Sequence, residues 1–267
     1  MASQSQPEDE LELLFNLRMK AHRIGEPPMG SSTELAQWLA ERELARVSGR
    51  SALPSAAEAI AGRTIAGSWW GEPEGSLIFR LLTELEDAPG APSDVALLEG
   101  KRTLVSPRLA PTVLAVTRDR GRRQRVIAQL TEPARRLLEV LAAGKVVRSD
   151  EPELGGKDLR AARVALEAGL LATSTSVHTA SGRHVSLIEY AGDEPTSADS
   201  GGPAVAAVPL DELFRAALRA AVVAEEREVE RWFRFVEPDE SLRAAAVARL
   251  EARRIVAGGK TWLSLPQ

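Results

Sequence analysis

Apolar residues recur at helical spacing along most of this chain and alternate only in short stretches. The strongest helical pattern is an apolar stripe along residues 74–87. Two short segments, 95–98 and 103–105, flank Glu99-Gly100, where glycine allows the positive φ that a tight hairpin turn needs. The pattern therefore predicts a mainly α-helical α+β protein with small β-hairpins.

Two segments of the chain nearly repeat each other. Both begin Leu-Arg-Ala-Ala, at Leu159 and at Leu242, and they match over about a dozen residues with a one-residue insertion. Each predicts a short amphipathic helix that leads directly into a hairpin, and the second hairpin closes at Gly258-Gly259. Residues 55–118 predict a third, more divergent unit in the order helix, helix, hairpin. A helix followed by a β wing is typical of the winged helix-turn-helix, so the sequence predicts tandem units of this kind.

Helix-capping residues and changes in composition suggest where these units begin and end. Ser55, with Glu58 three positions later, forms a capping box for a helix that we expect to reach Trp70. Residues 193–203 contain only small, polar and acidic residues and proline, as linkers do. We therefore predict an N-terminal helical extension (1–54), a divergent winged-helix unit (55–126), a winged-helix unit (127–192), a linker (193–208) and a C-terminal winged-helix unit (209–267).

Composition excludes several classes of function. The chain has no cysteine, which rules out disulfides, thiol catalysis and thiolate metal sites, and its three histidines are too few to favour a zinc site. No apolar run approaches the roughly 18 residues of a membrane span. The acidic, polar start is unlike a signal peptide. We therefore expect a cytoplasmic protein without a metal or cofactor.

Positive charge is concentrated in one region, although the net charge of the chain is −4. Eight lysines or arginines and a single acid, Asp119, occur between Lys101 and Arg125. Arginine binds phosphate through two parallel hydrogen bonds, which favours contact with a nucleic-acid backbone. The densest part of the region separates two predicted elements, so we expect it to be exposed, either as a phosphate-binding segment or as a solvated linker. Its candidate residues are Arg118, Arg120, Arg122, Arg123 and Arg125.

The repeated helix and its wing supply the other candidate contacts. Lys157, Arg160 and Arg163 fall three positions apart on the outer face of the first copy, as a recognition helix requires. Arg243, Arg249 and Arg253 take broadly similar positions in the second copy. In the wing of the first copy, three residues near the hairpin tip could touch a phosphate: His178, Arg183 and His184. The alternative for both sets is an ordinary solvated surface.

Part of the chain resembles a known family. The segments Ser68–Arg80 and Leu97–Leu109 and the wing His178–His184 are similar to proteins related to the AlkZ/YcaQ DNA glycosylases, over roughly residues 56–190. The resemblance implies a tandem winged-helix fold and DNA binding; the family excises alkylated or crosslinked bases. Its catalytic Gln-x-Gln or Gln-x-Asp motif is absent, because Gln37-Trp-Leu39 and Gln124-Arg-Val126 lack the second polar residue. We therefore assign no catalytic residue.

The sequence favours a non-enzymatic tandem winged-helix protein that binds double-stranded DNA in DNA repair or transcription regulation. Two alternatives stay open. One is a DNA glycosylase of the AlkZ/YcaQ type, and the other is a winged-helix scaffold for protein–protein interaction, which the acidic pI favours. We expect double-stranded DNA and protein partners, and neither a membrane nor a small-molecule cofactor.

Overall fold

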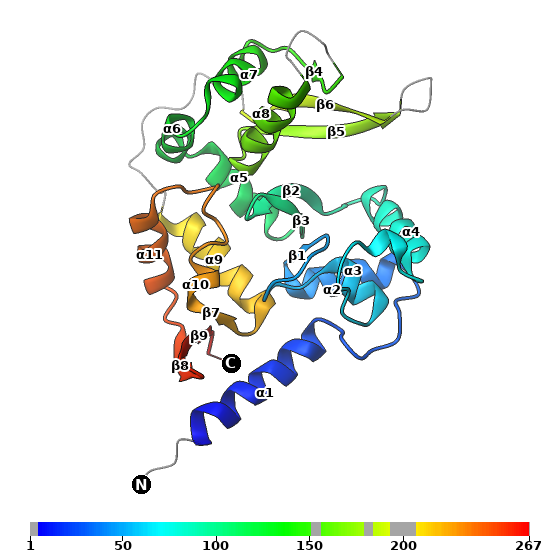
Figure 1. Cartoon of the computed structure of the whole chain (residues 1–267), viewed down its shortest axis with the longest axis vertical. Helices are drawn as coiled ribbons and strands as arrows, with labels where there is room; N and C mark the ends of the chain where they lie inside the picture. The colour runs from blue at the N-terminus through cyan, green and yellow to red at the C-terminus, as the bar shows by residue number, and fades with distance from the viewer. Residues whose placement is uncertain (1–4, 151–155, 179–183, 193–206, 267) are drawn as a thin grey trace.

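The protein is a mixed α+β protein in which helices accompany small antiparallel sheets (Figure 1). Its structure, a computed structural model, describes residues 5–150, 156–178, 184–192 and 207–266. The helical elements are α1 (Ser5–Ala21), α2 (Ser32–Arg42), α3 (Ala56–Ala61), the 3-10 turn η1 (Trp69–Gly71), α4 (Gly75–Glu86), α5 (Ala110–Arg118), α6 (Arg120–Ala128), α7 (Glu132–Ala142), α8 (Gly156–Ala168), α9 (Ala207–Ala221), α10 (Glu226–Val229) and α11 (Glu240–Ala248).

The sheets share one topology. Their strand orders are β1-β3-β2, β4-β6-β5 and β7-β9-β8, so in each sheet a short strand pairs with the second strand of a hairpin. We call α2–α4 with the first sheet the first unit, α7–α8 with the second sheet the second unit, and α9–α11 with the third sheet the third unit. The strands are β1 (Leu44–Arg46), β2 (Ser93–Leu98), β3 (Lys101–Val105), β4 (Val147–Arg148), β5 (Ala172–His178), β6 (His184–Tyr190), β7 (Ala224–Glu225), β8 (Arg253–Ala257) and β9 (Lys260–Ser264).

The hairpins expected from the sequence are present. The β2–β3 hairpin turns at Glu99-Gly100, and the β8–β9 hairpin turns at Gly258-Gly259, where both glycines have positive φ. Helices α8 and α11 each lead into a hairpin, as the two repeats predicted. The predicted tip of the β5–β6 hairpin lies outside the described residues, as does most of the predicted linker.

Residues 1–54 are more than a helical extension. Strand β1 pairs with β3 in the register Leu44↔Val105, so this segment completes the first sheet. The predicted boundary at 54/55 separates β1 from its pairing partner, and the predicted boundary at 126/127 falls within α6. The sequence did not reveal β1, because a three-residue strand with every side chain buried has no alternating pattern.

The helix predicted from Ser55 to Trp70 ends early. Ser55 does cap α3 by accepting a hydrogen bond from the Glu58 amide, but the helix stops at Ala61. Gly62 follows with a φ of +69°, and a Cβ there would lie 1.9 Å from the Glu26 carbonyl oxygen. A glycine is therefore required where the chain turns against the 25–27 segment, and the helix cannot continue.

The first and third units share one core. The inner face of helix α9 is apolar and buried, and Phe214 and Trp232 of the third unit pack in the same cluster as Leu97 and Val105 of the first sheet. Strand β7 follows α9 and separates it from α10. The C-terminal segment is thus joined to the first unit by a continuous apolar interior.

The N-terminal helix packs against the C-terminal sheet. Leu11 and Leu14 of α1 are buried in a cluster with Val223 and Ile255, and α1 contacts β8. This pairing joins opposite ends of the chain, which no local pattern in the sequence indicates. Over the part of the chain that the structure describes, every helix is too short or too polar to cross a membrane.

Candidate nucleic-acid interface

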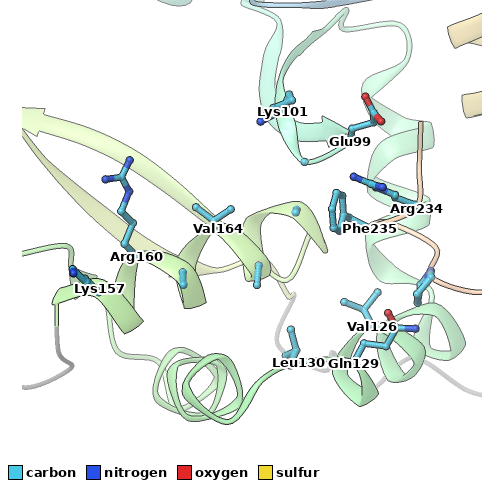
Figure 2. Close-up of a pocket in the computed structure, with 15 residues that line it drawn as sticks. Glu99, Lys101, Val126, Gln129, Leu130, Lys157, Arg160, Val164, Arg234 and Phe235 are labelled. Carbon is cyan, nitrogen blue, oxygen red and sulfur yellow. The ribbon is translucent and has the colours of Figure 1, made fainter. Parts of the chain in front are cut away.

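A cleft of about 840 Å³ opens where parts of the three units meet (Figure 2). The β2–β3 turn, α6, α8 and the loop after α10 contribute its walls. Its lining combines cationic side chains with apolar ones. The residues are Glu99, Gly100, Lys101, Val126, Gln129, Leu130, Lys157, Arg160, Ala161, Val164, Ala165, Ala168, Arg234, Phe235 and Pro238.

Four exposed cations line this cleft. They are Lys101, Lys157, Arg160 and Arg234, and none of them has a carboxylate within 4.0 Å among the described residues. Glu99 is the only acid among the described residues of the lining, and in Figure 2 its carboxylate points away from the Phe235 ring. The cleft therefore carries a net positive charge that an anionic ligand can neutralise.

Helix α8 presents one face to the core and the other to the cleft. Leu159, Ala162 and Leu166 share one face of the helix because they recur at three- and four-residue spacing. This face is buried in a cluster with α7 and the second sheet. Lys157 and Arg160 lie on the other face, as the sequence predicted for them. These two candidates are the ones that the structure brings together in the cleft.

The β2–β3 turn reaches across to the end of α8. A Cβ on Gly100 would lie 3.0 Å from the Ala168 Cβ and 3.4 Å from Cδ2 of Phe235. The Glu99 amide donates a 2.7 Å hydrogen bond to the Trp232 carbonyl oxygen, which anchors the turn to the third unit. The first hairpin thus forms one wall of the cleft.

We expect Gly100→Ala to lower the free energy of unfolding by about 2 kcal/mol, because its positive φ is strained for an alanine and the new methyl would crowd Ala168. Gly259→Ala is the matched control. Gly259 also has a positive φ, of +70°, but an added methyl would have no atom within 4 Å, so that variant should lose only about 1 kcal/mol. Urea unfolding of both variants measures the difference. Equal losses of unfolding free energy would mean that the added methyl at position 100 does not clash with α8.

The basic run between Arg118 and Arg125, predicted to be exposed, is exposed only in part. Asp119 caps helix α6, which begins at Arg120 and contains most of the run. Arg122 is buried, and its guanidinium donates to the carbonyl oxygens of Gly169 (2.7 Å), Val236 (3.1 Å) and Thr117 (3.3 Å). Burial, together with the nearby charge of Arg123, lowers the pKa of Arg122 to about 10. This side chain holds the fold together and is not available to a phosphate.

Arg123 and Arg125 of the same run also have partners within the protein. Arg125 forms a two-pronged ion pair with the buried Glu237, and Arg123 donates to the Tyr190 hydroxyl at 2.6 Å. Arg118 and Arg120 are exposed at the junction of α5 and α6 and do not line the cleft. Arg122, Arg123 and Arg125 therefore connect α6 to the second and third units, whereas Arg118 and Arg120 are exposed.

Arg163 is half-buried and donates to the Ser186 hydroxyl at 2.7 Å, which directs it toward the sheet and away from the cleft. The backbone of His178 pairs with that of His184 in the β5–β6 ladder, while Arg183 lies outside the described residues.

The arginines of the second repeat are engaged within the protein. Arg249 pairs with Asp211 and Arg253 with Glu10, and Arg243 donates to two backbone carbonyl oxygens. All three arginines of the second repeat therefore have partners within the protein, whereas Lys157 and Arg160 of the first repeat have no carboxylate partner among the described residues.

Arg234 and Phe235 were not predicted from the sequence. They follow α10 in a turn region without periodicity, about 65 residues beyond α8 in the sequence. Lys101 lay within the basic region, but only its place beside the Glu99-Gly100 turn distinguishes it from its neighbours. No group of three or more metal-ligating side chains occurs among the residues with described positions.

Comparisons with known proteins add no assignment. Neither a family model, nor a characterised protein, nor a solved structure matches the chain. The resemblance to AlkZ/YcaQ-related proteins therefore stays a prediction.

Proposed function

We propose that this chain is a tandem winged-helix protein that binds DNA through the cleft between its units. The order of elements supports the fold assignment: each unit has helix, short strand, helix and hairpin, with the short strand paired to the hairpin. In winged helices the helix before the hairpin meets the nucleic acid. In the second unit this helix is α8, which carries Lys157 and Arg160.

The observation that carries the proposal is the set of cleft cations that have no acidic partner among the described residues. Elsewhere on the surface many exposed arginines are held by acids, as Arg102 is by Asp94 and Arg254 by Glu226. Around the cleft, Lys101, Lys157, Arg160 and Arg234 have no acidic partner among the described residues. Unpaired cations on one concave surface favour a polyanion, because each phosphate contact releases bound counterions.

Salt dependence tests the proposal. If the four cations each meet one phosphate, affinity for a labelled 20-base-pair duplex should fall on the order of 100-fold between 50 and 200 mM salt. Fluorescence anisotropy at several salt concentrations measures this slope. An affinity that does not change with salt concentration, or no binding at 50 mM salt, would show the proposal to be wrong.

The double substitution Lys101→Ala/Arg160→Ala should weaken duplex binding on the order of ten-fold and reduce the salt slope by about 2, because two phosphate contacts are lost. Arg136→Ala is the matched control, since Arg136 is an exposed arginine of the second unit that pairs with Glu132 outside the cleft. It should leave both quantities unchanged. Equal effects of the two variants would mean that the duplex binds elsewhere.

A further inference from the structure

Phe235 is a large aromatic residue that is 42% exposed and lines the cationic cleft. The neighbouring Phe233 is fully buried. Large aromatic side chains normally bury, and an exposed one in a concave site points to a ligand.

The ring of Phe235 is held in place while part of its surface stays open. The guanidinium carbon of Arg234 lies 4.8 Å from the ring centroid. The β2–β3 turn approaches the ring edge at Gly100. A partly exposed aromatic ring beside a guanidinium can bind a nucleic-acid base, because bases stack on both aromatic rings and guanidinium groups.

The rest of the cleft has the polarity that a nucleotide needs. Val164 of α8 is 47% exposed in the cleft and extends the apolar surface from Phe235, as Figure 2 shows. Lys157 and Arg160 lie farther along α8, toward its N-terminus, while Lys101 follows Gly100, which adjoins Phe235. The cleft thus offers apolar surface at Phe235 and Val164, with cations at both ends.

A base inside a duplex cannot use this surface. Both faces of a paired base are covered by its neighbours in the stack, and the β2–β3 turn approaches the C-terminal end of α8 at Ala168, so a DNA groove cannot enclose that end. A base can therefore reach Phe235 only if it is unpaired. Paired DNA can contact the cations of the cleft but not the Phe235 ring.

We propose that the cleft binds an unpaired nucleotide of a DNA strand, with its base against Phe235 and its phosphates near Lys101, Lys157 and Arg160. This inference rests on the proposed DNA binding and specifies its substrate: DNA with an unpaired or extruded nucleotide. Stacking on one aromatic side chain should raise affinity on the order of ten-fold over that for a fully paired duplex.

Three labelled probes of matched sequence test the inference by anisotropy at one salt concentration: a paired 20-base-pair duplex, the same duplex with a central one-nucleotide bulge, and the single strand. The wild-type protein should bind the bulged and single-stranded probes about ten-fold more tightly than the paired duplex. Phe235→Ala should remove this preference and leave paired-duplex affinity within two-fold. Phe235→Tyr keeps the ring and should keep the preference, provided that circular dichroism shows both variants folded.

Phe79→Ala is the control for a general loss of exposed aromatic surface, since Phe79 is 52% exposed on α4, outside the cleft. It should preserve the preference. Equal affinities for all three probes, or a preference that survives Phe235→Ala, would overturn the inference while leaving salt-dependent duplex binding intact. Loss of all binding by the wild-type protein would instead refute the proposed function itself.

Discussion

Replacing Arg122 by methionine is expected to lower the free energy of unfolding by about 3 kcal/mol. The buried guanidinium satisfies the carbonyl oxygens of Gly169, Val236 and Thr117, and methionine would leave all three without that donor. The loss is smaller than the sum of three hydrogen bonds, because removing a buried charge also recovers its desolvation cost. The lowered pKa of Arg122 reflects that cost.

Under the proposed function, the same substitution should also weaken binding to a DNA duplex. Gly169 follows the end of α8 and Val236 adjoins Phe235, so Arg122 connects two walls of the cleft. Urea unfolding and duplex anisotropy measure the two effects. Arg120→Met is the matched control, because Arg120 is exposed on the same helix, and it should change stability by less than about 0.5 kcal/mol. An Arg122→Met protein as stable as the wild type would mean that desolvation cancels the three hydrogen bonds.

Acidification is expected to destabilise the protein through His22, by about 3 kcal/mol between pH 6.5 and pH 4. Burial, together with the nearby charges of Arg18 and Arg42, lowers the pKa of His22 from 6.5 to about 4. The folded state therefore binds the proton less readily than the unfolded state. Stability from this group is complete above pH 6.5 and is lost as the pH falls toward 4.

His22→Gln separates this effect from the titration of carboxylates. Nε2 of His22 lies 3.1 Å from the Ala220 carbonyl oxygen, and a glutamine amide can donate to the same oxygen without titrating. Urea unfolding of both proteins at pH 7, 6, 5 and 4.5 should show the wild type losing stability faster than the variant. Parallel curves would mean that His22 binds its proton equally well in the folded and unfolded states.

The local sequence determined much of the secondary structure. Glu99-Gly100 and Gly258-Gly259 predicted hairpins because glycine alone adopts positive φ without strain, and the two Leu-Arg-Ala-Ala segments predicted helices that precede hairpins. Lys157 and Arg160 were recognised as outward-facing because the helical period places them opposite the buried Leu159. These features depend only on residues a few positions apart.

Only the tertiary structure decided which cationic side chains are exposed to a ligand and which are buried. Arg122 and Arg160 are indistinguishable as residues in an arginine-rich chain, yet one is buried against backbone carbonyls and the other lines the cleft. The difference depends on partners as distant as Val236, which no local pattern identifies.

The sequence by itself determined the helices, the hairpins and the concentration of positive charge, because spacing and turn residues act over short distances. Only the tertiary structure placed β1 beside β3, joined α1 to the C-terminal sheet and brought Phe235 next to Gly100. These contacts form between segments far apart in the chain, where the free energy of packing, rather than local propensity, selects the partner.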